Sequence, residues 1–265
     1  MRFTPWAALC GMLLLTQQAL GQQDFVQSDG HKCGMLGDAH SDPEKALNPL
    51  KNRFDPPADD DIDGDVSLAA ILSPGDDLGR FDDHKAARVA GFVINVKVGG
   101  NETCNCHATD PVDRDTHIEL GLSKTAPETQ RVIVEVTPRL RAKMEEQGLD
   151  WTTEGLRKAI KGKWIEVSGW LLFDTAHINE AENTNPGGDG NWRATCWEVH
   201  PITSLKVLAG PPAEMAELHP ATMAAFQKAQ AKQVQRDPQK AAAIRKRNQE
   251  ILSKFANDEL DKDHP

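Results

Sequence analysis

The sequence predicts a mainly β protein: a five-stranded Greek-key barrel preceded by an acidic extended N-terminal arm and followed by a C-terminal helical tail. Three observations support this prediction. Residues 86–209 contain five segments with strand patterning, a helix-forming stretch separates the third segment from the fourth, and the flanking regions lack that patterning. Three strands, a helical connection and two more strands is the order of an OB-like barrel, and about 120 residues can bury one core.

The five strand segments alternate in polarity or are rich in β-branched residues. They are RVAGFVINVKV (88–98), HIELGL (117–122), RVIVEVT (131–137), KWIEVSGWLLFD (163–174) and RATCWEVHPITSLKVL (193–208). Successive side chains of a strand point to opposite faces, so the apolar alternate positions are expected to fill the barrel. These positions are Ile118, Leu120, Leu122, Val132, Val134, Val136, Ile165, Val167, Leu171, Phe173, Trp197 and Val199.

The first 21 residues have the pattern of a cleaved signal peptide. Arg2 gives a basic start, an apolar run follows at 6–15, and small residues precede Gln22. The apolar run is about ten residues, whereas a bilayer span needs about twenty. We therefore expect an exported protein, periplasmic or secreted, that begins at Gln22 and has no stable membrane insertion.

The two regions that flank the barrel differ in composition. Residues 22–85 are rich in Asp, Pro and Gly, which predicts an acidic, partly disordered arm with one short docking piece at 66–72. Residues 210–265 predict a tail of two polar helices. The second helix is amphipathic, with Ile244, Ile251 and Phe255 on one face that would dock on the barrel or on a partner.

The cysteines indicate a disulfide framework. Signal cleavage leaves Cys33, Cys104, Cys106 and Cys196, and an even number in an oxidising compartment favours bridges. We expect Cys196 to pair with Cys104 or Cys106, and Cys33 to take the remaining partner. The alternative is a zinc site built from Cys104, Cys106 and His107.

Charge and motifs narrow the function classes. A formal net charge of −10 argues against a nucleic-acid partner, because phosphate backbones require a basic surface. The sequence shows no Gly-rich phosphate loop, no Gly-x-Ser-x-Gly elbow and no His-Glu-x-x-His helix.

The polar faces of the strands supply the candidate site residues. Alternation places His117, Glu119, Glu135, Glu198 and His200 on outward faces, away from the barrel interior. Two long polar loops, 99–115 and 174–191, occupy the positions where OB-like barrels commonly bind ligands. The candidate ligand-binding set is His117, Glu119, Glu135, His177, Trp192, Arg193, Glu198 and His200.

Three interpretations of these polar faces stay open. The first is the ordinary solvated outside of a half-buried sheet. The second is a polar binding surface. The third is a divalent-metal or acid–base site formed by His117, Glu119, Glu198 and His200, with Asp115 or His177 as a further ligand.

Two resemblances follow from these motifs. The pattern CNCHATDPVDRDTHIEL, VIVEVTPR, VSGWLLFDTAH and WRATCWEVHPIT, within residues 86–208, resembles exported bacterial OB-fold-like proteins of unassigned function, which implies a fold and no reaction. RVIVEVTPR is also similar to a strand and turn of the thermonuclease-like OB-folds. Arg131 matches that family, but Val136 and Arg139 stand where its carboxylates belong. The resemblance therefore implies no calcium-dependent phosphodiester cleavage.

The function expected from the sequence is a non-catalytic exported binding module without a cofactor. Its partner would be an unknown ligand or another exported protein. The alternative is a nuclease-like hydrolase that uses one divalent metal ion on the barrel surface.

Overall fold

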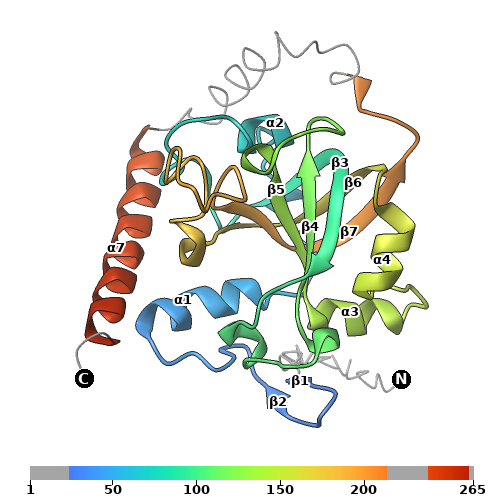
Figure 1. The fold of residues 1–265 in the computed structure, drawn as a ribbon, viewed down its shortest axis with the longest axis horizontal. Helices are drawn as coiled ribbons and strands as arrows, with labels where there is room; N and C mark the ends of the chain where they lie inside the picture. Colours follow the sequence, from blue (N-terminus) through green and yellow to red (C-terminus); the bar gives the residue numbers. More distant parts are fainter. Residues whose placement is uncertain (1–23, 214–237, 263–265) are drawn as a thin grey trace, which may run out of the picture.

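The computed structural model describes residues 24–213 and 238–262 (Figure 1). The expected signal peptide and residues 214–236 of the first tail helix lie outside the described residues. The centre of the structure is a closed five-stranded barrel. Its strands are β3 (Ala86–Val98), β4 (Thr116–Gly121), β5 (Val132–Val136), β6 (Trp164–Phe173) and β7 (Trp197–Leu208).

The strand order confirms the predicted OB-like barrel. The strands close in the order β3-β4-β5-β7-β6, and all neighbours are antiparallel except β5 and β7, which run parallel with Val134 opposite Val199. This is the order of an OB barrel, in which the third strand in sequence pairs with the fifth. Each predicted strand segment overlaps one of these five strands, although residues 193–196 of the fifth segment precede β7.

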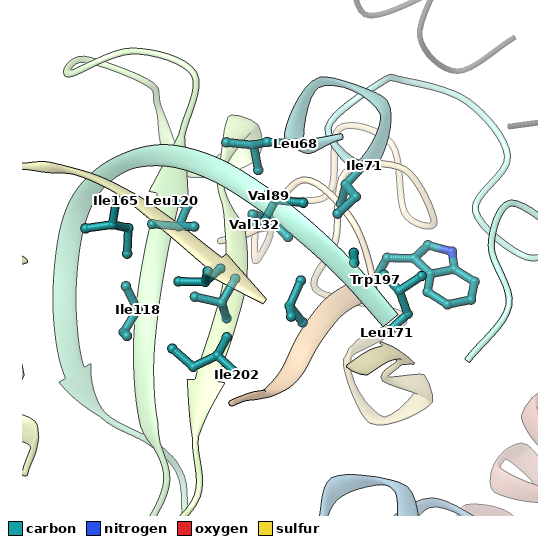
Figure 2. Close-up of a cluster of buried hydrophobic side chains, with 14 of the residues drawn as sticks. Leu68, Ile71, Val89, Ile118, Leu120, Val132, Ile165, Leu171, Trp197 and Ile202 are labelled. Atoms are coloured by element: carbon teal, nitrogen blue, oxygen red, sulfur yellow. The ribbon is translucent and has the colours of Figure 1, made fainter. Parts of the chain in front are cut away.

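The barrel interior holds the alternate apolar side chains that the pattern predicts (Figure 2). Ile118, Val134, Val167 and Val199 are fully buried in one core cluster. Trp197 closes the cluster on one side, with its ring edge-on to Phe81 at a centroid distance of 5.2 Å. At about 25 cal/mol per Å² of apolar surface removed from water, this burial is the main stabilising contribution to the barrel.

Two short helices make the connection between β5 and β6. α3 (Pro138–Glu145) begins where the Thr137 side chain accepts a hydrogen bond from the Leu140 N–H, and α4 (Thr153–Ile160) begins with Thr152 in the same role. Leu140 and Ile160 point from these helices into the core cluster. The connection is therefore helical, as its sequence predicts.

The N-terminal segment is more regular than the predicted extended arm. It contains a two-stranded hairpin, β1 (Phe25–Val26) and β2 (Lys32–Cys33), then α1 (Asp42–Lys51) and α2 (Leu68–Ile71). A capping box fixes the start of α1, because Ser41 accepts from the Glu44 N–H and Glu44 accepts from the Ser41 N–H. α2 lies in the predicted docking piece, and all four of its residues are buried.

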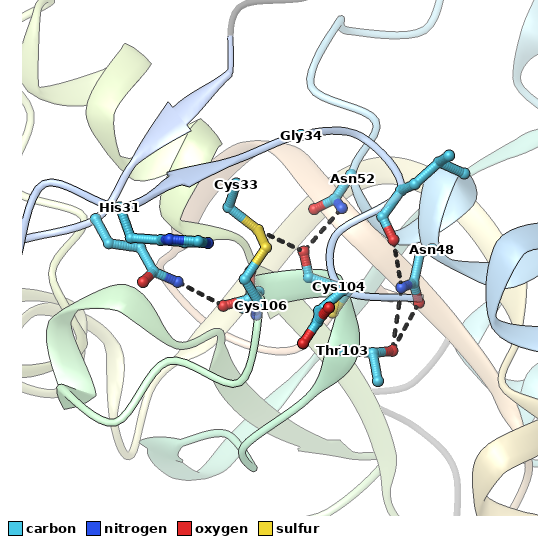
Figure 3. The surroundings of a disulfide bond; sticks show 12 residues. His31, Cys33, Gly34, Asn48, Asn52, Thr103, Cys104 and Cys106 are labelled. Atoms are coloured by element: carbon cyan, nitrogen blue, oxygen red, sulfur yellow. Dashed lines mark hydrogen bonds between the residues drawn. A yellow bond between two sulfur atoms is a disulfide. The ribbon is translucent and has the colours of Figure 1, made fainter. Parts of the chain in front are cut away.

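One disulfide ties the N-terminal hairpin to the loop after β3 (Figure 3). It joins Cys33 to Cys106, whereas Cys104 and Cys196 are buried free thiols. The expectation that Cys196 forms a bridge is therefore wrong. Cys196 belongs to the core cluster, and its Sγ lies 3.4 Å from the Thr184 hydroxyl. Because Cys106 is bonded to Cys33, the alternative zinc set of Cys104, Cys106 and His107 is not formed either.

Replacing Cys33 and Cys106 together with serine is expected to lower the free energy of unfolding by about 2–4 kcal/mol. The bridge joins residues that are 73 positions apart, so its removal raises the conformational entropy of the unfolded chain. Urea unfolding of the oxidised protein and of the double variant measures the difference. Peptide mapping without reductant should recover Cys33 joined to Cys106, and a bridge through Cys196 would contradict the structure.

The C-terminal helix α7 (Pro238–Lys262) docks on the segment between α2 and β3. The Asn248 side chain donates to the Leu78 carbonyl at 2.6 Å, and Arg247 pairs with Asp83 at 2.9 Å. Ile244 is buried in this contact, as the amphipathic pattern predicts, whereas the side chain of Phe255 lies outside the described part. No helix within 24–213 and 238–262 is long and apolar enough to cross a membrane.

Candidate functional site

The outward polar faces of β4, β5 and β7 are buried, which corrects the expectation that they form a solvated surface. His117 is 5% exposed, Glu135 is 2%, and Glu198 and His200 are 0%. The reason is coverage from outside the barrel: α1 lies against β7 and against the loop that follows β3 (Figure 1). Alternation within a strand separates the inside of a barrel from the outside, but it does not show what covers the outside.

A continuous chain of charged side chains fills this covered region, and we call it the charge network. Its members come from α1, from the loops after β3 and β6, and from β4, β5 and β7. They are Lys51, Glu102, Asp115, His117, Glu135, Asp174, His177, Arg193, Glu198 and His200. Charged side chains that are buried so close together need oppositely charged partners, because an isolated ion in a protein interior is strongly destabilising.

Lys51 anchors one end of the charge network. Its Nζ lies 2.6 Å from Glu102 Oε2 and 2.9 Å from Asp174 Oδ2. Burial opposes the ionisation of Glu102, but Lys51 overcomes it and lowers the pKa of Glu102 to about 2. The pKa of Asp174 lies well below its ordinary value, because Lys51 and His177 outweigh the effect of burial. Lys51 therefore holds two carboxylates ionised.

Arg193 and Glu198 form a fully buried ion pair. Arg193 Nη2 lies 2.6 Å from Glu198 Oε1, and both side chains are fully shielded from solvent. Arg193 also donates from Nε to the Thr195 carbonyl at 2.8 Å. Burial disfavours the charge on Glu198, but Arg193 lowers the pKa of Glu198 below its ordinary value. The ion pair therefore persists in the interior.

Glu135 joins the two strand histidines. Its carboxylate lies 3.1 Å from His117 Nε2 and 3.4 Å from His200 Nδ1, and Glu198 Oε2 lies 3.2 Å from the same Nδ1. Burial opposes protonation of the rings, but Glu135 raises the pKa of His117 to about 9 and also raises the pKa of His200 to about 9. Glu135 therefore favours the protonated form of both rings.

Asp115, at the end of the loop after β3, is the member of the charge network that lies next to the Cys104 thiol. Asn105 donates to Asp115 Oδ2 at 2.9 Å, and Cys104 Sγ lies 3.9 Å from the same oxygen. Burial, together with Glu135 and Glu102, raises the pKa of Asp115 to about 7. Burial also raises the pKa of the Cys104 thiol well above its ordinary value, which suits an inert structural thiol rather than a nucleophile.

A pocket of about 540 Å³ opens above the charge network. It lies between α1 and the two loops that the sequence singled out, 99–115 and 174–191. Its lining includes Lys51, Lys97, His117, His177 and Trp192. The remaining lining residues are Glu44, Leu47, Asn48, Val98, Gly99, Gly100, Asn101, Glu102, Thr103, His107 and Ala176.

Trp192 forms one wall of this pocket. Lys97 Nζ lies 4.7 Å from the centre of the Trp192 ring, and the His117 ring is stacked near it at a centroid distance of 6.3 Å. The indole nitrogen donates to Glu180 Oε2 at 2.6 Å. The tryptophan is half-buried and held in place, so one aromatic surface is fixed among basic groups.

The sequence-predicted candidates therefore divide into three groups. His117, His177 and Trp192 line the pocket. Glu135, Arg193, Glu198 and His200 form the buried layer behind it. Glu119 lies apart from this layer, because it pairs with Lys97 at 2.9 Å and with Arg131 at 2.8 Å.

Among the described residues, the ligand atoms of the predicted metal set do not converge on one point. This set is His117, Glu119, Glu198 and His200. The groups whose ligand atoms lie mutually within 4.8 Å in or beside the charge network have different memberships: Asp115 with Glu135 and His200; Asp174 with His177 and Glu198; and Glu102 with Cys104 and Asp115. A fourth group, outside the charge network, is Asp82, Asp83 and His84. Glu119 is held away by its two basic partners.

Sequence reasoning missed Lys51, Lys97, Glu102 and Asp174. The first of these had a detectable signal. The stretch SDPE begins with Ser and has Glu three residues later, which is the capping-box pattern that starts a helix. A helix from that point places Lys51 in its last turn, but no pattern in the sequence shows that this helix packs against the barrel.

Comparisons with known proteins add little to this description. No family model matches the sequence, and no curated protein matches it. Among solved structures, the chain is similar to Entamoeba histolytica asparaginyl-tRNA synthetase, with 13% identity and a TM-score of 0.25. The match covers 64% of this chain and 29% of that one, so this chain spans less than a third of that enzyme. So low a TM-score carries no argument, and the OB-like classification rests on the strand order.

Proposed function

We propose that this protein is a non-catalytic exported binding module whose pocket takes a small organic anion. The observation that carries the proposal is the pocket itself, placed between α1 and the two loops where OB-like barrels bind ligands. Its volume of about 540 Å³ is within the range of small-molecule sites. The disulfide between Cys33 and Cys106 supports export, because such bridges persist in oxidising compartments.

The charges of the lining favour an anion. Lys51, Lys97, His117 and His177 line the pocket together with two carboxylates, Glu44 and Glu102, and Glu102 is paired with Lys51. Glu135 and Asp174 lie behind the two histidines. Burial opposes protonation of His177, but Asp174 raises its pKa. These four basic residues outnumber the two carboxylates of the lining, which supports binding of an anion. The half-buried Trp192 ring offers contact to an apolar or planar part of the ligand.

The rival function, a metal-dependent hydrolase, receives less support. Hydrolysis requires a metal-bound water that reaches the substrate. Of the predicted ligands, Glu198 and His200 are fully buried and are not among the residues that line the pocket. A substrate in the pocket would therefore not contact them.

Binding of a small anion should depend on Lys97. Citrate and adenosine monophosphate, titrated against the full chain, are expected to bind and to quench tryptophan fluorescence. Lys97→Met should weaken this binding about tenfold, because the substitution removes the exposed cation over the Trp192 ring. Lys124→Met is the matched control, since Lys124 carries the same charge on an exposed turn outside the pocket lining. Equal loss in both variants would show a general charge effect and contradict the proposal. Hydrolysis of bis(p-nitrophenyl) phosphate, lost in His117→Ala, would favour the rival.

A further inference from the structure

Seven buried atoms of the charge network have no hydrogen-bond partner among the described residues, and four of them lie in ion pairs instead: His117 Nε2, Glu135 Oε2, Arg193 Nη2 and Glu198 Oε1. The other three are Asp115 Oδ1, His200 Nε2 and Arg193 Nη1. Only the first two of these can bind a metal ion, because a guanidinium group has no lone pair to offer. The two side chains are 1% and 0% exposed, so bulk water does not serve them. Leaving a buried polar atom unpaired is destabilising by about 1–3 kcal/mol, and by more for a charged group. These atoms therefore point to a ligand that would interact with them.

The two side chains meet a third at one point. Asp115, Glu135 and His200 each offer a ligand atom, and these atoms all lie within 4.8 Å of one another. Asp115 immediately precedes β4, Glu135 lies near the end of β5 and His200 lies in the first half of β7, and these are neighbouring strands of a closed barrel. Ligand atoms around one divalent ion lie on the order of 3–3.5 Å apart, so small side-chain movements would close this group on an ion.

The surrounding side chains match the outer layer of a metal site. Glu198 Oε2 lies 3.2 Å and Glu135 Oε2 lies 3.4 Å from His200 Nδ1, which leaves Nε2 as the ring nitrogen without a hydrogen bond. An ion on Nε2 would therefore leave Glu198 on Nδ1 and would require the Glu135 carboxylate to turn from Nδ1 toward the ion. Metal-binding histidines are typically held in this way, with a carboxylate on the ring nitrogen that does not bind the metal. Asn105 holds the other oxygen of Asp115 at 2.9 Å. The orientation of both side chains is therefore already set.

We propose that Asp115, Glu135 and His200 form a buried binding site for a divalent first-row metal ion, with Zn²⁺ as the expected occupant. One imidazole and two carboxylates suit Zn²⁺ better than Ca²⁺, which prefers oxygen ligands alone. None of the three residues is among those that line the pocket, and each is at most 2% exposed. The ion would thus tie β4, β5 and β7 together. This inference does not depend on the proposed binding function.

Metal content is the first test. The full chain is stripped with a chelator in urea, refolded with ZnCl₂ so that burial does not block entry, dialysed and measured by elemental analysis. The expected result is one Zn²⁺ per chain, with a higher unfolding midpoint than the metal-free protein. CaCl₂ in place of ZnCl₂ should leave less than a tenth of an equivalent. Failure to retain Zn²⁺ would overturn the proposal.

Variants locate the ion. Asp115→Asn and His200→Gln keep side-chain size and are expected to weaken Zn²⁺ binding about 100-fold or more. Glu119→Gln is the control, because Glu119 is a buried strand carboxylate that pairs with Lys97 and Arg131 outside the proposed set. Unchanged affinity in the first two variants, or an equal loss in the control, would contradict the assignment.

Zinc-edge X-ray absorption of the wild-type chain tests the ligand set without relying on variants that fold. The three proposed residues supply only nitrogen and oxygen, at about 2.0–2.2 Å from the ion. A sulfur shell at about 2.3 Å would place the ion at Cys104 or Cys196, the free thiols among the described residues, and would overturn the proposal.

Discussion

Replacing Arg193 with methionine is expected to lower the free energy of unfolding by about 3–5 kcal/mol. The substitution keeps much of the side-chain volume but leaves Glu198 fully buried without its closest cation, which lies 2.6 Å away. Removing one member of a buried ion pair is far more destabilising than the net stability that the pair contributes, because the remaining charge stays desolvated. Urea unfolding at pH 7, followed by tryptophan fluorescence, measures the loss.

Two further variants test whether the loss of stability comes from the unpaired charge on Glu198 or would follow the removal of any cation. Lys158→Met breaks an exposed pair with Glu154, at a distance of 3.5 Å, and should change stability by less than about 0.5 kcal/mol. Arg193→Met combined with Glu198→Gln should recover part of the loss, since a buried amide is less unfavourable than a buried carboxylate. If the double variant is less stable than Arg193→Met alone, the loss comes from packing and not from the orphaned charge.

Lys51→Met is expected to be destabilising by a similar 3–5 kcal/mol at pH 7, and this loss should shrink in acid. In the wild type the pKa of Glu102 is about 2 and that of Asp174 is well below its ordinary value. Both carboxylates are held below their unfolded pKa values of about 4. The stability they contribute is therefore fully present above about pH 4.5 and is lost as the pH falls toward about 2.

In Lys51→Met the two carboxylates remain buried without their shared cation, so they are easier to protonate in the folded state. Lowering the pH then reduces the destabilisation of the variant, whereas it lowers the free energy of unfolding of the wild type. The two free energies of unfolding should therefore approach each other below about pH 4.5. Urea titrations at pH 7, 5 and 3 measure this convergence. A difference that stays constant over that range would show that Lys51 acts through packing alone, and the Lys158→Met curve should run parallel to the wild type throughout.

Much of the barrel could be predicted because its determinants are local. Alternation in KWIEVSGWLLFD and in RATCWEVHP assigns each side chain to one face, and a barrel has one inside that must be apolar. Val167 and Val199 are accordingly buried in the core. The loops 99–115 and 174–191 follow from the same strand order, and their positions next to one pocket are a consequence of the topology.

The burial of the opposite face was decided only by tertiary structure. Glu135, Glu198 and His200 have the pattern of solvated strand positions, and nothing near them in sequence indicates a cover. The cover is α1, from a segment whose Asp, Pro and Gly content resembles a loose arm, and its Lys51 reaches carboxylates that are 51 and 123 positions away. Cysteine pairing was decided in the same way, because it depends on which sulfurs the packed chain brings within bonding distance. Periodicity reports the local environment of a strand, whereas contacts between distant segments depend on how the whole chain packs.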